Sequence, residues 1–85
     1  MAEVTIYSTK VCPYCVKAKQ LLTSKGADFK EIDISQDIAL VAEAQRRSGG
    51  RKTVPQIFIN DKHIGGCDDL FALDAAGQLE ALLRD

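Results

Sequence analysis

Residues 4–15 read VTIYSTKVCPYC and place two cysteines shortly after a β-rich segment. The β-branched and aromatic side chains of residues 4–7 are typical of a strand. Pro13 suits the first position of a helix, because the N–H that proline lacks has no helical partner there. The stretch therefore predicts a strand that leads through a short loop into a helix, with Cys12 and Cys15 at the helix start.

A thiol at a helix start is chemically activated. Unpaired N–H groups and the positive end of the helix dipole stabilise negative charge there, and Lys10 adds a second positive charge near Cys12. The thiolate is the form that attacks disulfides. Cys15 shares a helix face with Ala18 and Leu22, so we expect it to be shielded. The pattern predicts a redox pair in which Cys12 attacks and Cys15 resolves the mixed disulfide.

The rest of the chain alternates between strand and helix signals. Beyond residues 4–7, strands are predicted at 28–34, 56–59 and 63–64, the last two joined as a hairpin by turn residues 60–62. The first helix should end before Gly26. Ser35 is expected to cap a second helix, which residues 48–50 terminate and which points Ile38, Val41 and Ala42 inward. After Gly65-Gly66, helical spacing returns at Leu70 and Leu73, and again after Gly77 at Leu79, Leu82 and Leu83.

This order, β-α-β-α-β-β-α, predicts one α/β domain over residues 1–85, with a four-stranded mixed sheet and three or four helices. A β-α-β unit implies parallel strands joined by a right-handed crossover, and the hairpin adds antiparallel strands. We find no linker or internal repeat in the sequence.

Composition narrows the class of function. A formal net charge of -1 provides no basic surface for nucleic acid. No apolar run reaches the ~20 residues that span a bilayer, and the N-terminus lacks a signal-peptide pattern. The odd number of cysteines, three, argues against a secreted disulfide scaffold. We therefore expect a cytoplasmic protein that contacts neither membrane nor nucleic acid.

A Cys-x-x-Cys pair is also half of a zinc site. The other ligands would have to come from Cys67 and His63, because the chain has no further cysteine or histidine and no second Cys-x-x-Cys. We expect no bound metal. Cys67 is interpreted as a small, partly buried residue and His63 as a surface residue of the hairpin.

Three motifs together extend this interpretation. They are Cys12-Pro13-Tyr14-Cys15, Thr53-Val54-Pro55 and Gly65-Gly66-Cys67-Asp68-Asp69. In this order and separation, the chain resembles a dithiol glutaredoxin of the small bacterial type over essentially its whole length. The resemblance implies a thioredoxin-like fold and a monomer. It also implies glutathione as the reductant of protein disulfides and protein–glutathione mixed disulfides, with ribonucleotide reductase as one candidate partner.

The resemblance also implies a glutathione site. Pro55 would be cis, and Val54 would pair its N–H and C=O with the cysteinyl unit of glutathione, as in β-strand addition. The Asp68-Asp69 helix start would receive the γ-glutamyl end, although simple helix capping stays open. Arg51 and Lys52 are either contacts for the glycyl carboxylate or free surface charges, and we prefer the second interpretation. The implied binding set is Lys10, Tyr14, Thr53, Val54, Pro55, Gly66, Cys67, Asp68 and Asp69, beside the redox pair Cys12 and Cys15.

Three other functions remain open from the sequence. A glutaredoxin-like thioredoxin, served by a flavoprotein reductase, would share the cysteine pair but need no glutathione groove. An iron–sulfur carrier would hold a cluster through Cys12 of two subunits and two glutathiones. A non-catalytic interaction domain would show no glutathione-dependent turnover.

Overall fold

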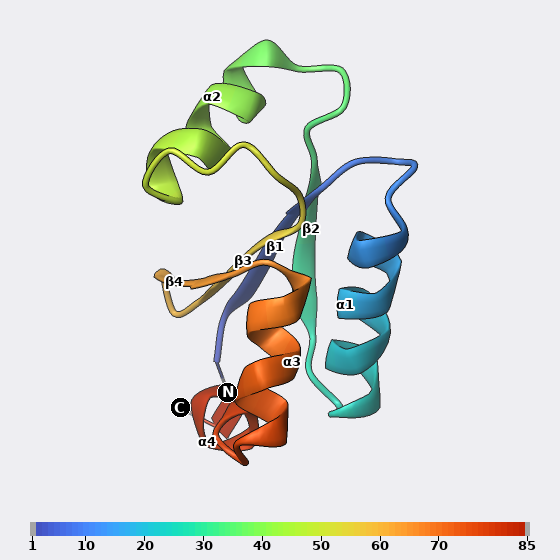
Figure 1. Cartoon of the computed structure of the whole chain (residues 1–85), viewed down its shortest axis with the longest axis vertical. Helices are drawn as coiled ribbons and strands as arrows, with labels where there is room; N and C mark the ends of the chain where they lie inside the picture. The colour runs from blue at the N-terminus through green and yellow to red at the C-terminus, as the bar shows by residue number, and fades with distance from the viewer. Residues whose placement is uncertain (1, 85) are drawn as a thin grey trace.

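Strand β1 (Val4–Ser8) lies inside a four-stranded sheet in the computed structural model, which describes residues 2–84 (Figure 1). Its neighbour on one side is β2 (Phe29–Asp33), which runs parallel to it. On the other side β3 (Gln56–Ile59) runs antiparallel, and β4 (Lys62–Gly65) forms the far edge. The sheet order β2-β1-β3-β4 confirms the predicted mixed sheet.

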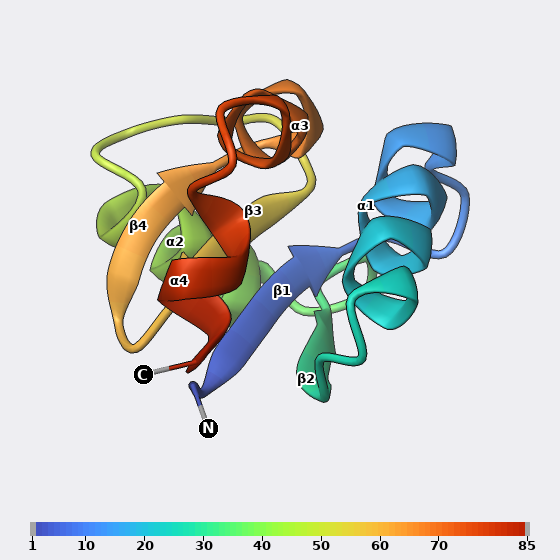
Figure 2. The ribbon, with the colours of Figure 1, turned by 90° about the horizontal axis from the view of Figure 1, so that it is seen from below.

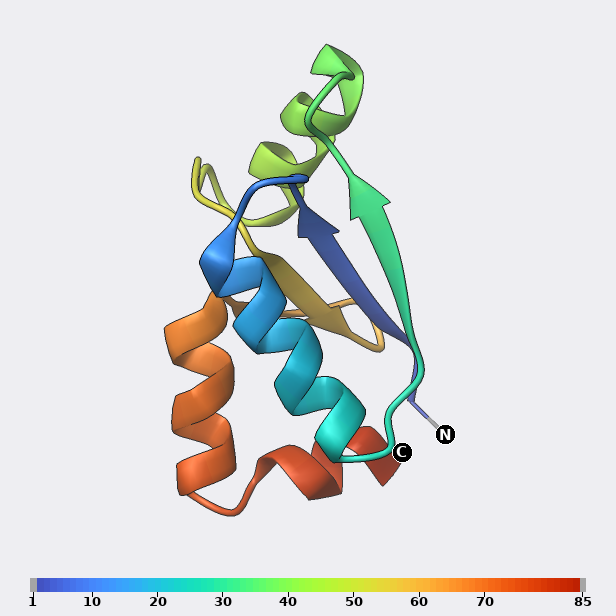
Figure 3. The same cartoon turned by 90° about the vertical axis from the view of Figure 1, so that its right-hand side faces the viewer.

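Helices cover both faces of the sheet. Helix α1 (Pro13–Ser24) and helix α3 (Cys67–Ala75) lie side by side on one face, as Figures 2 and 3 show, and α2 (Ile38–Arg47) covers the other. The short helix α4 (Leu79–Arg84) follows α3 and packs through its buried Leu79. This arrangement is the thioredoxin-like fold that the family resemblance implied.

The alternation of strand side chains divides the core in two. The larger half joins β1 and β3 to α1, α3 and α4, and its buried members are Val4, Ile6, Ala18, Leu22, Ile57, Ile59, Cys67, Leu70 and Leu79. The smaller half lies against α2 and contains Tyr7, Ile34, Ala44 and Phe58. Burial of these apolar side chains supplies the main driving force that fixes both helix layers on the sheet.

Helix α2 starts later than we predicted. Asp37, not Ser35, is its N-cap, and its Oδ1 accepts hydrogen bonds from the N–H groups of Ala39 (2.9 Å) and Leu40 (3.4 Å). Ser35 lies in the preceding turn, where its N–H and hydroxyl both donate to Asp33 Oδ1. The predicted cap was wrong because an aspartate two residues downstream provides an equally good acceptor.

The inward face of α2 was also partly wrong. Ile38 is 88% exposed and Ala42 is exposed, whereas Val41 packs against the smaller core as predicted. Leu40 and Ala44 complete the inward face. The residues 38, 41 and 42 and the residues 40, 41 and 44 both fit helical spacing, and the sheet selects the second set.

The predicted hairpin is confirmed, with a longer last strand. Asn60 (φ 51°) and Asp61 (φ 64°) occupy the left-handed region, as a two-residue type I′ turn requires. Strand β4 reaches Gly65, beyond the predicted end at residue 64. The strand therefore leads directly into the start of α3, beside the loop that precedes β3.

None of the helices within residues 2–84 is long and apolar enough to cross a membrane.

Candidate active site

The sulfur of Cys12 caps helix α1. Cys12 has an extended backbone (φ -148°, ψ 101°), and its Sγ accepts a hydrogen bond from the N–H of Cys15 across 3.1 Å. The N–H of Val16 donates to the carbonyl of Cys12 and begins the helix. A cap residue normally offers an oxygen to these free N–H groups. Here a half-buried sulfur takes that place, so the helix start stabilises negative charge on the sulfur itself.

Cys15 lies one turn further along α1 on the buried face. Only 1% of its surface is exposed, which confirms the predicted inward position. Burial, and then its hydrogen bond with Cys12, raise the pKa of the Cys15 thiol to about 12. Cys15 therefore remains a thiol at neutral pH. All three cysteines are free, so the structure describes the reduced state.

The loop before β3 lies against the cysteine pair. The Val54–Pro55 peptide bond is cis, as the family resemblance implied. The Sγ of Cys12 lies 3.9 Å from the carbonyl oxygen of Val54, within reach of a weak S–H hydrogen bond. This contact places a main-chain edge beside the sulfur.

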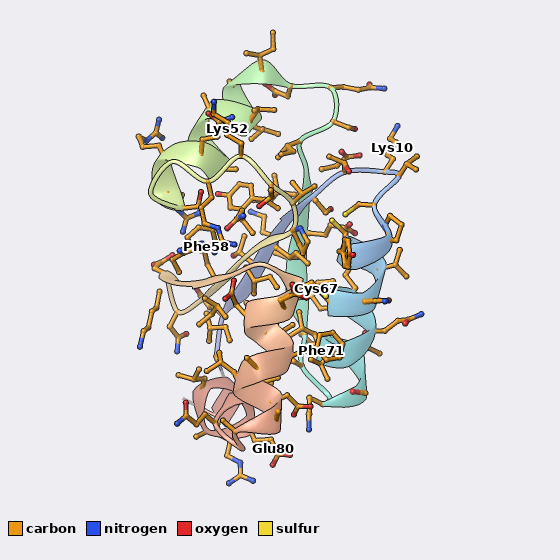
Figure 4. The ribbon with its side chains drawn as sticks, viewed as in Figure 1. Lys10, Lys52, Phe58, Cys67, Phe71 and Glu80 are labelled. Atoms are coloured by element: carbon orange, nitrogen blue, oxygen red, sulfur yellow. The ribbon has the colours of Figure 1, made fainter. Side chains whose placement is uncertain are left out.

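A cavity of about 290 Å³ opens between this loop and the start of α3. Eight residues of the predicted binding set line it: Tyr14, Thr53, Val54, Pro55, Gly66, Cys67, Asp68 and Asp69. Lys10 lies outside this set, at the outer end of the loop between β1 and α1 (Figure 4). Arg51 lines the cavity, contrary to our preference for a free surface charge, whereas Lys52 does not.

The two aspartates at the start of α3 have different surroundings. Asp69 Oδ2 accepts a hydrogen bond from the N–H of Gly66 (2.9 Å) and pairs with Arg51 (3.2 Å). The bond from Gly66, followed by the Arg51 guanidinium, holds the pKa of Asp69 below its usual range. Asp68 is exposed, and within residues 2–84 its side chain makes no hydrogen bond or ion pair. Asp69 is therefore the capping residue, and Asp68 faces the cavity.

Two glycines allow α3 to start this close to the loop. Gly65 has a φ of +123°, and a Cβ at this position would collide with the carboxylate of Asp69. A Cβ on Gly66 would meet the carbonyl oxygen of Pro55 at 3.4 Å. From the sequence, Gly65-Gly66 fits either plain turn residues or positions where a missing side chain lets a ligand approach the backbone. Gly65 instead makes room for the chain's own cap.

Cys67 is the first residue of α3 and is 6% exposed. Figure 4 shows it at the end of α3 that faces the cavity. Burial, and then the negative charge of Asp68, raise the pKa of its thiol. Its surroundings therefore favour the unreactive thiol, in contrast to the capping position of Cys12.

Of two polar residues behind the loop, Gln56 escaped the sequence analysis and His63 was misplaced by it. Gln56 is fully buried and hydrogen bonds to Thr53, and the Nε2 of His63 lies 2.8 Å from Gln56 Oε1. The expected surface position of His63 was wrong, because the ring is half-buried beside Phe58. The available signal was Gln56 itself, an amide at the head of an otherwise apolar strand.

Side chains that could bind a metal ion form no cluster in the described part of the chain. Among residues 2–84, the structure contains no group of three or more histidine, cysteine, aspartate or glutamate side chains that could hold a metal ion.

A capping cysteine after the central strand, a buried second cysteine and a cis-proline loop beside them define a thiol–disulfide oxidoreductase of thioredoxin-like fold. Residues 4–64 match the family model described as Glutaredoxin. The chain is 57% identical over 84 residues to Glutaredoxin 3 of Escherichia coli (strain K12), with 99% of this chain and 100% of that protein covered. The chain belongs to the glutaredoxin family and is a glutathione-dependent oxidoreductase.

Solved structures agree with this assignment. A glutaredoxin from Brucella melitensis is 57% identical, with a TM-score of 0.84, and the match covers 95% of this chain and 87% of that one. A buckwheat glutaredoxin in complex with glutathione is 33% identical, with a TM-score of 0.87, and the match covers 95% and 76% of the two chains.

Proposed function

We propose that this protein removes glutathione from glutathionylated proteins with Cys12 as nucleophile, and reduces protein disulfides with Cys15 as the resolving thiol. The observation that carries the proposal is the capped sulfur of Cys12, 3.1 Å from the N–H of Cys15 and beside a cavity suited to a small peptide. Its partners are disulfide-bonded and glutathionylated proteins, with ribonucleotide reductase as one candidate. We further propose that it acts as a cytoplasmic monomer.

The first route uses one cysteine. The Cys12 thiolate attacks the glutathionyl sulfur of the mixed disulfide, the old S–S bond breaks, and the protein substrate leaves as a thiolate that takes up a proton. Glutathione is now disulfide-bonded to Cys12. A second glutathione thiolate attacks its sulfur, which releases oxidised glutathione and restores the Cys12 thiolate.

The second route uses both cysteines. Cys12 attacks a protein disulfide and forms a mixed disulfide with it. Cys15 then loses its proton and attacks Cys12, which frees the reduced substrate and leaves a Cys12–Cys15 disulfide. Two glutathiones reduce this bond in turn. Cys15 acts only when Cys12 already carries a partner, because only then is there a disulfide bond for it to attack.

The cavity provides complementary groups for each part of glutathione. The main chain of Val54 faces the cysteinyl unit, next to the sulfur of Cys12. The exposed carboxylate of Asp68 suits the α-ammonium of the γ-glutamyl end, and the free N–H groups at the start of α3 suit its carboxylate. Arg51 lines the cavity and Lys10 does not, so we assign a carboxylate of glutathione to Arg51. Tyr14 and Thr53 form the walls.

A coupled assay tests the proposal. A glutathionylated peptide is offered with glutathione, glutathione reductase and NADPH, and the protein should turn it over at a rate that saturates with the peptide. Cys12→Ser should abolish turnover, and Cys67→Ser should retain it. Turnover that depends on thioredoxin reductase instead of glutathione, or activity that survives in Cys12→Ser, would overturn the proposal.

A further inference from the structure

A chain of three side chains runs from the hairpin to the cis-proline loop. Gln56 Nε2 donates hydrogen bonds to the carbonyl oxygen of Thr53 (2.9 Å) and to its hydroxyl (3.2 Å). At the other end of the same amide, Gln56 Oε1 lies 2.8 Å from His63 Nε2. Gln56 is 0% exposed, so no solvent can replace either contact without a change in the fold. Within residues 2–84, no hydrogen bond joins these three side chains to the sulfur of Cys12, whose partners are Val54 and Cys15.

The chemistry of the groups fixes the direction of this chain. The carbonyl of Thr53 can only accept, so the amide nitrogen of Gln56 must face it. The amide oxygen of Gln56 therefore faces His63, and His63 must carry its proton on Nε2. Burial, and then the nearby positive charge of Arg51, lower the pKa of His63. The neutral Nε2–H tautomer of His63 thus holds the Gln56 amide in the orientation in which its nitrogen donates to Thr53.

The hydrogen bond from Gln56 to the carbonyl of Thr53 also fixes the direction of the N–H of Val54, which belongs to the same peptide group. The peptide between Thr53 and Val54 is trans and planar, since the cis bond in this loop is the next one, Val54–Pro55. In a trans peptide the C=O and the N–H point in opposite directions. When Gln56 holds the carbonyl of Thr53, it directs the N–H of Val54 away from Gln56. Val54 lines the cavity.

We propose that Gln56 is a positioning residue for glutathione recognition, which orients the Thr53–Val54 peptide toward the glutathionyl group, and that His63 sets the orientation of Gln56. The inference rests on the proposed binding of glutathione along Val54. It assigns selectivity for the glutathionyl group to two residues outside the cavity, and it leaves the reactivity of Cys12 to the helix start.

Two substrates separate positioning from general damage. One is a peptide glutathionylated on its cysteine, and the other is the same peptide carrying cysteamine, which has a thiol arm but no peptide group to pair with Val54. The readout is the ratio of kcat/KM for the glutathionyl substrate to kcat/KM for the cysteaminyl substrate. Gln56→Glu keeps an acceptor for His63 but replaces the donor to Thr53. Gln56→Met removes the amide and with it the hydrogen bonds to both Thr53 and His63, and its apolar side chain suits the buried position.

We expect the ratio to fall about tenfold in both Gln56 variants, because the buried hydrogen bonds from the Gln56 amide to Thr53 are lost. His63→Phe should give a smaller fall, since Gln56 remains but its amide is free to turn. Ile59→Val, a buried substitution on the same strand, is the matched control and should leave the ratio unchanged at a comparable loss in Tm.

The possible failures are distinct. If wild type does not prefer the glutathionyl substrate, the proposed glutathione site itself is wrong. If wild type shows the preference and the Gln56 and His63 variants keep it, the positioning role is wrong. If both substrates slow equally in the folded variants, Gln56 acts on Cys12 or on stability, which also overturns the inference.

Discussion

The main-chain N–H of Cys15 points at the sulfur of Cys12 across 3.1 Å, while the Cys15 side chain is buried behind it. One residue therefore contributes to two different steps. Its backbone N–H donates a hydrogen bond to the attacking sulfur, and its buried thiol is the group that we propose resolves the mixed disulfide on Cys12. This separation makes the two contributions experimentally independent.

Cys15→Ser should divide the two proposed routes. The substitution keeps the N–H that caps Cys12, so removal of glutathione from a glutathionylated peptide should continue at a rate within about threefold of wild type. Reduction of a protein disulfide should fall by about a hundredfold or more, because an intramolecular thiol reacts at an effective concentration far above that of free glutathione. Steady-state rates with the two substrates check this. Loss of the first activity with retention of the second would reverse the assigned roles.

The buried thiol of Cys15 predicts a loss of stability at alkaline pH. An unfolded cysteine ionises near pH ~8.5, whereas burial raises the pKa of Cys15 in the folded protein to about 12. Between these values the unfolded chain has released a proton that the folded chain retains, so a rise in pH favours unfolding. Urea unfolding under reducing conditions from pH 7 to 11 should show a smaller decline for Cys15→Ala than for wild type. Parallel declines would contradict the shift.

Asp68 and Asp69 should respond differently to substitution. Asp68→Asn removes a charge that faces the cavity, so KM for the glutathionylated peptide should rise several-fold with Tm almost unchanged. Asp69→Ala removes the acceptor of the Gly66 N–H and should cost about 1 kcal/mol of unfolding free energy. Kinetics and thermal unfolding of both variants check this. If Asp68→Asn binds substrate normally, its carboxylate does not contact glutathione.

The sequence was sufficient for the element order and for the placement of the two cysteines at the helix start because local rules act strongly there. Cys12-Pro13 combines a cap position with a residue suited to the first turn, and Cys15, Ala18 and Leu22 share one face at helical spacing. In α2, two sets of apolar residues fit the helical period equally well. Only contact with Tyr7 and Phe58 on the sheet decides between them, and that contact is not visible locally.

The site shows the same limit. Eight of the residues predicted from the motifs line one cavity. No local sequence pattern, however, indicates which basic side chain lies beside that cavity. Arg51 is placed there by its pairing with Asp69, 18 residues later, whereas Lys10 lies at the outer end of the loop between β1 and α1. Gln56 and His63 are likewise joined only by the pairing of β3 with β4.

Gly65→Ala should destabilise the protein by about 2 kcal/mol, since it combines an unfavourable backbone with a collision. The φ of +123° disfavours any side chain, and the new Cβ would meet the Asp69 carboxylate that caps α3. Gly77→Ala is the matched control: its φ is +73°, and its Cβ would meet nothing within 4 Å, so only the backbone cost of about 1 kcal/mol remains.

A double-mutant cycle isolates the collision. With Asp69→Ala already present, Gly65→Ala should cost less than it does in the wild-type background, because the carboxylate that the new Cβ would meet has gone. Urea unfolding of the three Gly65 and Asp69 variants beside wild type gives the coupling free energy. A coupling near zero would mean that Gly65 is required for its backbone conformation alone. A coupling of about 1 kcal/mol would show that Gly65 is required because it leaves room for the Asp69 carboxylate, which caps α3 and lines the cavity.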